Sequence, residues 1–247
     1  MLQVQQISRS FAGRQVVRQL SFSVGAGEVV GFLGPNGAGK STSMKIIAGF
    51  LPPSSGTVRL QGLDIQRQRR QAQQILGYLP EGAPCYGEMQ VLDFLRFIGR
   101  IRGLQGRQLQ QRLQQLGSQL ELEQVWRQRI DTLSKGFKRR VGLAQAIIHQ
   151  PPIVLLDEPT DGLDPNQKHQ VHQLIRELAR DRVIVVSTHI LEEVSALCNR
   201  VMLLHHGRLL VDESPQQFVA RAPAALTGNQ NQAMEQVFRQ LTCGDET

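Results

Sequence analysis

One stretch constrains the fold of this chain more than any other: Gly34-Pro35-Asn36-Gly37-Ala38-Gly39-Lys40-Ser41. It matches the pattern G-x-x-x-x-G-K-[ST], in which glycines let backbone N–H groups turn inward around phosphate oxygens. The apolar run 29–33 before it predicts a buried strand, and residues 41–48 predict a helix closed by Gly49. Strand, loop and helix in this order are the context that the pattern requires, which disfavours a chance glycine-rich turn.

The last two residues of this stretch have the chemistry that a phosphorylated nucleotide requires. Lys40 is long enough to reach β- and γ-phosphates, and the hydroxyl of Ser41 can ligate Mg²⁺. The start of the following helix adds a partial positive charge that favours anions. The loop therefore predicts a nucleotide site with a metal ion.

Composition narrows the class of protein. The chain has 247 residues, 40% hydrophobic and 20% charged, which suits one large α/β domain or one domain with a tail. The net charge of +7 could face nucleic acid, acidic lipid or nucleotide, but only 5% aromatic residues disfavour a base-stacking platform. A position beside an anionic membrane fits better. We see no membrane span, signal peptide or cysteine ligand pattern, and expect a cytosolic protein with reduced thiols.

Apolar runs and helical periods alternate along the chain. The expected strands are 2–7, 20–24, 57–61, 75–79, 153–156, 183–186 and the hairpin 201–204 with 208–211. Leucines at three- and four-residue steps within 91–129 predict packed helices, and Asp164-Pro165 predicts a helix start. Such alternation implies a mostly parallel sheet.

Polar groups follow the ends of three expected strands: the phosphate loop, Asp157-Glu158 and His189. Ligands of parallel sheets bind at the carboxyl ends of the strands, so we expect these groups to form one site. Asp157 follows four apolar residues, as does the carboxylate on the Mg²⁺ side of phosphate-loop enzymes, and Glu158 can reach a γ-phosphate and a water. The alternative is an acidic pair that only caps the next turn.

Other features have plainer interpretations. His205-His206 occupy neighbouring strand positions that point to opposite faces, so we favour hairpin histidines over a metal site. Phe11 alone is an ordinary half-buried aromatic residue of the first loop. The chain should end in a polar tail with a short amphipathic helix at 234–241 and an acidic, frayed end.

Together these motifs make the chain resemble the nucleotide-binding subunit of ABC transporters over nearly its whole length. The segments and their family counterparts are 34–41 for the phosphate loop, Leu133-Ser134-Lys135-Gly136-Phe137 for the LSGGQ signature, 155–160 for Walker B and 161–164 for the D-loop. His189 stands at the switch histidine, and Phe11 matches the aromatic residue that stacks on adenine. The signature and segment 78–81 are similar to those of gliding-motility and multidrug-type exporters.

The resemblance implies an α/β phosphate-loop NTPase fold: a mostly parallel sheet core, an N-terminal antiparallel β subdomain and a helical subdomain inserted at about 88–150. The ATPase domain would cover 1–220 and the tail 221–247. Glu158, His189 and Lys40 would carry catalysis, and Ser41, Asp157 and Glu81 would surround Mg²⁺. The implied ATP contacts are Phe11, Gly34, Pro35, Asn36, Gly37, Ala38, Gly39, Lys40, Ser41, Thr42, Glu81, Ser134, Gly136 and Asp164.

Three places depart from the family pattern. In the signature, Lys135 replaces the usual first glycine and Phe137 replaces the usual glutamine, while Ser134 and Gly136 match the family pattern. The D-loop begins with Asp161-Gly162 rather than Ser-Ala. Glu81 occupies the position of the usual Q-loop glutamine, so it bears directly on Mg²⁺ coordination.

The function implied by the resemblance is ATP binding and hydrolysis that energises a separate membrane permease, with export as the expected direction. Two subunits, expected to be identical, would meet head to tail, each ATP lying between one phosphate loop and the partner's signature. Peripheral attachment to the cytoplasmic face of the inner or plasma membrane would follow, with no nucleic acid as partner. The alternative is a non-transport ABC ATPase acting on nucleic acid or the ribosome, but the chain holds neither a long coiled-coil insertion nor a second cassette.

Overall fold

Ten strands form two sheets in the part of the chain that the structure describes, residues 1–83, 85–223 and 230–243 of a computed structural model. The smaller, antiparallel sheet contains, in spatial order, β2 (Arg14–Val24), β1 (Leu2–Phe11), β4 (Ser55–Leu60) and β5 (Leu63–Asp64). The larger contains β10 (Arg208–Glu213), β9 (Arg200–His205), β3 (Val29–Leu33), β8 (Val183–Thr188), β7 (Ile153–Asp157) and β6 (Leu76–Leu79). All neighbouring strands of the larger sheet are parallel except β9 and β10, which form an antiparallel hairpin. The expected α/β fold class with a mostly parallel sheet is therefore confirmed.

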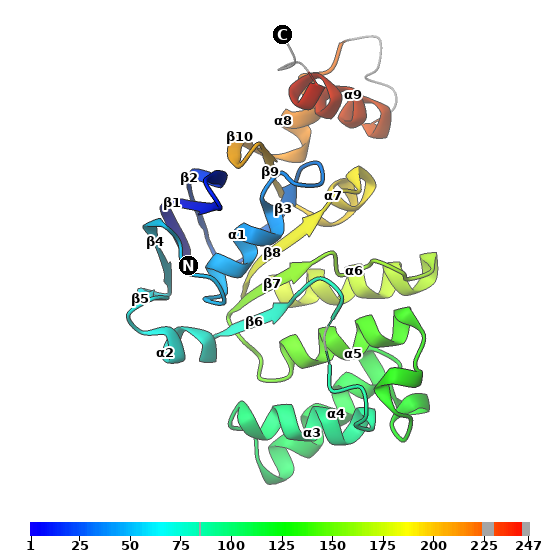
Figure 1. Cartoon of the computed structure of the whole chain (residues 1–247). Helices are drawn as coiled ribbons and strands as arrows, with labels where there is room; N and C mark the ends of the chain where they lie inside the picture. Colours follow the sequence, from blue (N-terminus) through cyan, green and yellow to red (C-terminus); the bar gives the residue numbers. More distant parts are fainter. Residues whose placement is uncertain (84, 224–229, 244–247) are drawn as a thin grey trace.

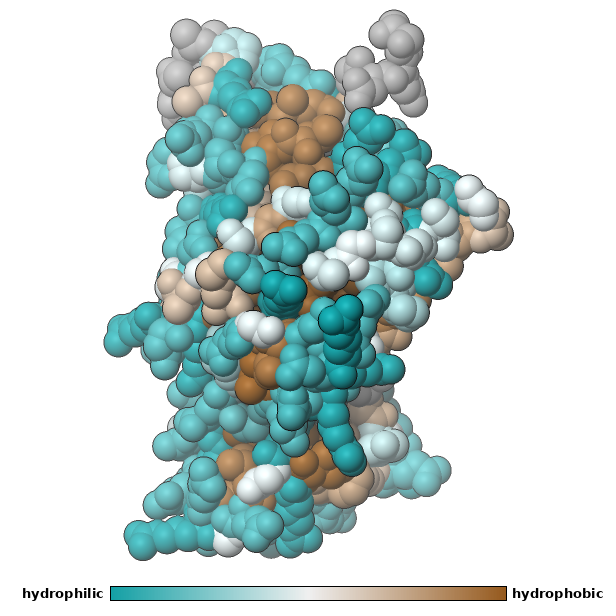
Figure 2. Space-filling model, turned by 90° about the vertical axis from the view of Figure 1, so that its left-hand side faces the viewer, coloured by the Kyte–Doolittle hydropathy of each residue, from teal (hydrophilic) through white to brown (hydrophobic). Residues whose placement is uncertain are grey.

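The first two strands are longer than the sequence pattern predicted. The ladder of β1 and β2 passes through register shifts, and Gln6 and Gln19 adopt positive φ angles of 48° and 47°. These irregularities break the strict alternation of apolar and polar residues, which is why the sequence pattern predicted only 2–7 and 20–24 as strands. Phe11 is consequently the last residue of β1, paired with Arg14, and not a loop residue. Figure 2 faces this side of the molecule, which is mostly hydrophilic with separate hydrophobic areas.

Helices cover both faces of the larger sheet. They are α1 (Lys40–Ile47), α2 (Arg69–Gln74), α3 (Val91–Ile101), α4 (Gly106–Gln119), α5 (Lys135–Ile147), α6 (Pro165–Ala179), α7 (Leu191–Leu197), α8 (Pro215–Ala220) and α9 (Gln230–Cys243), with short 3₁₀ turns at Glu123–Val125 and Ile130–Thr132. One apolar core joins α1 to the facing sides of both sheets, so α1 lies between the sheets. A second core joins the other face of the larger sheet to α3–α9.

The segment between β6 and β7 is helical, as predicted. Leu109, Leu113 and Leu116 recur along one face of α4, and all three are buried. In Figure 1 this group, α3 to α5, lies at the end of the molecule opposite α8 and α9. The leucine period therefore marks packed helices rather than a low-complexity tract.

The C-terminal helix is longer than the expected 234–241 and belongs to the packed structure. Ala233, Met234 and Val237 of α9 are buried in the second core, and the Ser195 hydroxyl of α7 donates to Met234 Sδ at 2.7 Å. The acidic end at 244–247 lies outside the described residues. No helix in the described ranges combines the length and apolar character needed to cross a bilayer.

Candidate nucleotide site

The expected polar groups come together at one edge of the larger sheet. Strands β3, β8 and β7 are parallel neighbours, with Leu33 paired to Thr188 and Asp157 paired to Ser187. The phosphate loop leaves the end of β3, Glu158 follows β7, and His189 follows β8. This is the carboxyl edge, where ligands of parallel sheets bind.

Lys40 occupies the inside of the phosphate loop. Its ammonium donates to the carbonyl oxygens of Gly34 at 2.6 Å and Pro35 at 3.1 Å. Burial lowers the pKa of Lys40, and the nearby charges of Glu158 and Asp157 oppose that shift. Lys40 therefore lies within the loop and close enough to Glu158 and Asp157 to feel their charges.

The loop is packed closely against the β9–β10 turn. Gly39 has a φ of 102°, and a Cβ built there would come within 2.8 Å of the Val16 carbonyl oxygen. The Gly207 N–H donates to the Ala38 carbonyl at 3.0 Å. Asn36 and Gly37 form the exposed tip of the loop. Glycine is thus required at 39 both by backbone conformation and by space.

Asp157 provides an oxygen suited to a cation. Its side chain is 1% exposed, and Oδ1 accepts a hydrogen bond from the Ser187 hydroxyl. Oδ2 is buried and has no hydrogen-bond partner among the described residues. A buried carboxylate oxygen left this way is costly unless a cation or water satisfies it. Ser41, in the first turn of α1, adds a hydroxyl, so these residues fit Mg²⁺.

Glu158 and His189 touch each other. His189 Nδ1 lies 2.8 Å from Glu158 Oε1, and the Glu158 N–H donates to the Ser187 carbonyl at 3.0 Å. The backbone of Glu158 is in the left-handed region, with a φ of 51°. This conformation is uncommon for a residue with a side chain, and such strain often accompanies a functional position.

The signature segment lies at the start of α5. Ser134 caps the helix by accepting from the Phe137 N–H at 3.3 Å. Gly136 is buried, and a Cβ there would come within 2.9 Å of Gln167 Oε1. Asp164 caps α6 by accepting from the Gln167 N–H at 3.0 Å. No hydrogen bond among the described residues joins the signature segment to the phosphate loop, so one chain does not bring these two predicted parts of the site into direct contact.

Helix α5 packs closely against both β6 and the segment that follows it. The Arg139 guanidinium donates to the Pro80 carbonyl at 3.2 Å. A Cβ at Gly77 would come within 2.3 Å of the Ala146 carbonyl oxygen, which leaves room only for glycine. Gly142 is similarly close to Ala83, at 2.7 Å for a built Cβ.

Glu81 and Phe11, two further predicted contacts, are both exposed. Glu81 is exposed, yet its charge acts on Lys40 and also helps to raise the pKa of the half-buried Tyr78, after desolvation and Asp157. Phe11 is 43% exposed, and the Arg9 guanidinium lies 4.8 Å from its ring centroid. Because Arg9 covers one face of the ring, a base can stack on the other face only.

Sequence reasoning missed Ser187 and the buried carboxylate of Glu193. Glu193 accepts hydrogen bonds from the hydroxyls of Thr160 and Thr188, which flank the loops of Glu158 and His189. The sequence signal for these residues was weak: a threonine shortly after β7, and a serine and a threonine at the end of β8.

The paired histidines are a hairpin feature, with one difference from expectation. His205 is buried and His206 exposed, but their ring centroids are only 4.0 Å apart. His206 has a φ of 47° and has left the strand, so strand alternation no longer separates the rings. No group of three or more metal-ligating side chains occurs in the described residues, and a metal site here has no support.

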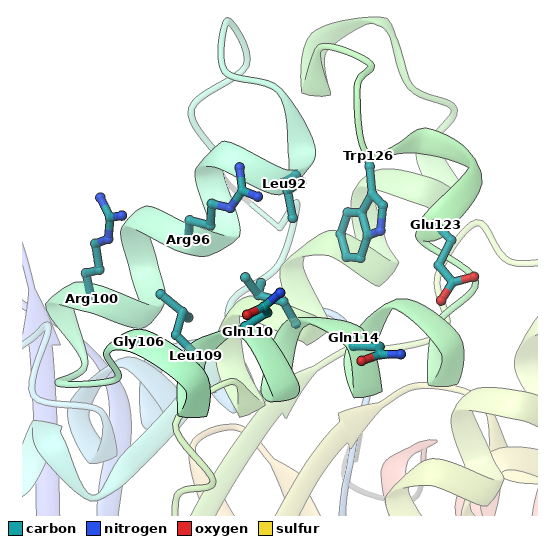
Figure 3. A pocket seen from close by; sticks show the side chains of 10 residues that line it. Leu92, Arg96, Arg100, Gly106, Leu109, Gln110, Gln114, Glu123 and Trp126 are labelled. Carbon is teal, nitrogen blue, oxygen red and sulfur yellow. The ribbon is translucent and has the colours of Figure 1, made fainter.

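A separate cavity of about 470 Å³ lies in the helical region. Figure 3 shows Leu92 of α3 and the Trp126 ring at this cavity, with Leu109 and Gln114 of α4 on its other side. None of its lining residues belongs to the nucleotide site.

Comparison with known proteins identifies the family. The family model described as ABC transporter matches residues 17–161. A Nod factor export ATP-binding protein I from a Rhizobium species is 37% identical over 214 residues, which are 86% of this chain and 70% of that protein. The solved ATP-binding subunit of an ABC transporter has a TM-score of 0.88 and 28% identity, covering 98% of this chain and 99% of its own.

A second solved structure agrees in fold. It is MJ0796, a bacterial ABC transporter cassette determined as a dimer, with a TM-score of 0.80, 23% identity and coverage of 87% of this chain and 98% of its own. Family match, identity and fold therefore agree with the geometry of the site. The chain belongs to the ABC transporter family and is one of its ATP-binding, ATP-hydrolysing subunits.

Proposed function

We propose that this subunit hydrolyses ATP in a head-to-tail pair, in which Ser134 and Gly136 of each copy complete the site at the other copy's phosphate loop. The observation that carries the proposal is the contact between Glu158 and His189 beside Lys40 and Asp157 at one sheet edge. The exposed Ser134, which has no hydrogen bond to its own phosphate loop, supports a site shared between two chains.

The chemistry divides among the chain's own residues. Lys40 and the loop N–H groups bind the phosphates, and Glu158 accepts a proton from the attacking water while His189 orients the Glu158 carboxylate. Ser41, Asp157 and Glu81 would hold Mg²⁺, which when bound neutralises charge on the phosphate oxygens. Phe11 would stack on adenine with its uncovered face, and Thr42 and Asp164 complete the proposed contacts.

We place the membrane partner at 81–86 and the helical group. Within this loop Pro84 lies outside the described residues. Tyr86 is exposed, and its ring packs edge-on against the rings of Phe94 and Phe97, with ring centroids 6.0 Å apart in each pair. Both phenylalanines belong to α3, and Ile101 at the end of that helix is also exposed. Exposed aromatic and aliphatic residues of this kind mark interaction surfaces. The partner would be a membrane permease, with the subunit held at the cytoplasmic face of the membrane.

Export is the proposed direction, supported by the Nod factor export relative. A non-transport ATPase acting on nucleic acid or the ribosome is not favoured, since the matched relative and the solved subunit are both transporter ATP-binding proteins. The domain division stays as proposed, with an ATPase domain at 1–220 and a tail at 221–247.

The test uses Glu158→Gln, because glutamine is nearly isosteric and cannot act as a base. Turnover should fall by about 10²–10⁴-fold, ATP binding should persist, and ATP-dependent dimers should accumulate in size-exclusion chromatography. Glu177→Gln, an exposed carboxylate of α6, serves as the control. Wild-type turnover by Glu158→Gln would remove Glu158 from its proposed role.

The shared site is tested by comparing Lys40→Ala with Ser134→Arg. The first should weaken ATP binding to the single subunit, because buried phosphate charge loses its partner. The second should spare that binding and block dimer formation. Equal loss of ATP binding in both variants would contradict a site shared between chains.

A further inference from the structure

A buried carboxylate connects the two loops that carry Glu158 and His189. Glu193, in the first turn of α7, is only 5% exposed. One of its oxygens accepts from the Thr160 hydroxyl and the other from the Thr188 hydroxyl, the latter at 2.8 Å. Thr160 lies two residues after Glu158, and Thr188 lies directly before His189. The Glu193 side chain therefore connects the loop after β7 to the end of β8.

In both hydrogen bonds the threonine hydroxyl donates and a carboxyl oxygen of Glu193 accepts. Both threonines are buried, and Thr188 Oγ1 also accepts from the Ile190 N–H at 3.0 Å. The backbone on each side of His189 is thus held through Thr188. Lys168 Nζ, 3.7 Å from Glu193 Oε1, partly balances the buried charge.

We propose that Glu193 is a positioning residue for ATP hydrolysis, which holds Glu158 and His189 in their mutual contact. The inference rests on the roles proposed above for Glu158 and His189. Their contact of 2.8 Å joins two loops of different strands, so it persists only while both loops keep their relative position. Glu193 contacts neither the phosphate loop nor Lys40 through any hydrogen bond among the described residues. Its loss should therefore affect turnover rather than ATP binding.

The experiment compares Glu193→Ala with Glu192→Ala, the same substitution at the exposed neighbouring position. A second pair is Thr188→Val, which removes the hydroxyl at nearly constant volume, and Thr188→Ser, which keeps it. The measurements are kcat, KM, affinity for a fluorescent ATP analogue and thermal unfolding of each variant.

Glu193→Ala and Thr188→Val should each lower kcat by about 10–100-fold, the usual effect of losing a partner that orients a reacting group. KM and nucleotide affinity should stay within about twofold of the wild type. Thr188→Ser and Glu192→Ala should retain wild-type kcat. A purely structural role would instead lower the unfolding temperature and leave the kcat of the folded fraction unchanged, which overturns the proposal.

Failure of the inference can be told apart from failure of the proposed function by assaying Glu158→Gln in parallel. If Glu158→Gln hydrolyses ATP at the wild-type rate, the proposed function fails and the inference with it. If Glu158→Gln is inactive while Glu193→Ala keeps wild-type kcat, the positioning role alone is wrong. Should Glu193→Ala not fold, the Thr188 pair decides, because equal kcat in its valine and serine variants contradicts the proposal.

Discussion

Lys135 of the signature segment and Asp161 of the D-loop form an ion pair, with Nζ 2.9 Å from Oδ2. Gly162 lies against the same lysine, since a Cβ there would come within 2.7 Å of Lys135 Cδ. The buried Arg139 guanidinium is 4.0 Å from Asp161. The sequence presented Lys135 and Asp161-Gly162 as separate departures from the family pattern. In space they compensate each other, because the added positive charge meets an added negative charge and the long side chain rests on a glycine.

This ion pair predicts that exchanging the charges of Lys135 and Asp161 restores ATPase turnover that reversing only one of them lowers. The side chains are 71% and 42% exposed, so Asp161→Asn should change the free energy of unfolding by less than about 1 kcal/mol. Lys135→Asp and Asp161→Lys should each lower ATPase turnover, since like charges separate the two segments. The double variant should recover part of the activity. Strictly additive losses in this double-mutant cycle would show that the pair is not coupled.

Stacking on Phe11 predicts a modest and base-independent effect. Phe11→Ala should weaken nucleotide binding by about 1–3 kcal/mol, for GTP almost as much as for ATP, because any base can stack on the ring. Calorimetric titration with both nucleotides measures this. Phe50→Ala, which removes another exposed aromatic side chain, should leave affinity unchanged. An unaltered affinity in Phe11→Ala would make Phe11 an ordinary surface residue.

The carboxylate at position 81 predicts an unusual dependence on metal. Glu81 adds negative charge next to a triphosphate when Mg²⁺ is absent, but can ligate Mg²⁺ when it is present. Glu81→Gln should therefore bind metal-free ATP more tightly than the wild type and keep measurable ATPase activity at saturating Mg²⁺. ATP affinity is titrated with and without Mg²⁺ in both forms. Identical metal-free affinities would instead favour a docking role for Glu81.

The lowered pKa of His149 predicts that the free energy of unfolding decreases at mildly acidic pH. Desolvation, aided by the charge of Arg102, lowers the pKa of His149 to about 4 from 6.5, and its Nε2–H donates to the Leu76 carbonyl at 3.2 Å. Between these values the unfolded chain binds a proton that the folded chain does not. The free energy of unfolding should therefore decrease as pH falls from 6.5 toward 4, by at most about 3 kcal/mol from this residue.

Urea unfolding at several pH values checks this prediction. His149→Gln keeps a donor for Leu76 and cannot take up the proton, so its stability should vary less with pH than that of the wild type. A remaining slope is expected because burial also lowers the pKa of His172. Identical slopes in His149→Gln and the wild type would exclude His149 as the source.

The parts of the site that the sequence predicted are those encoded locally. Lys40 follows from a contiguous loop pattern, and Asp157 from its place after a continuous apolar strand. The Glu193–Thr160 and Lys135–Asp161 contacts could not be predicted, because each joins segments that are far apart in the sequence. The Glu193–Thr188 contact is local, but no pattern in the sequence marked Glu193 as buried. The same holds for α9, whose buried Met234 is recognisable only once α7 is in place. Local pattern thus indicated where the strands end, and tertiary packing determined which side chains support them.

The tight packing of α5 on β6 has a mechanical consequence. The Arg139–Pro80 hydrogen bond and the approach of Gly142 to Ala83 hold the segment 80–83 against α5, and Gly77 of β6 lies against Ala146 near the end of the same helix. That helix begins at the signature serine, Ser134, and at 13 residues it is about 20 Å long. We therefore expect a displacement of the loop that contains Glu81 to move α5 and, with it, Ser134, so that a change outside the nucleotide site would alter the position of the proposed ATP-contacting serine.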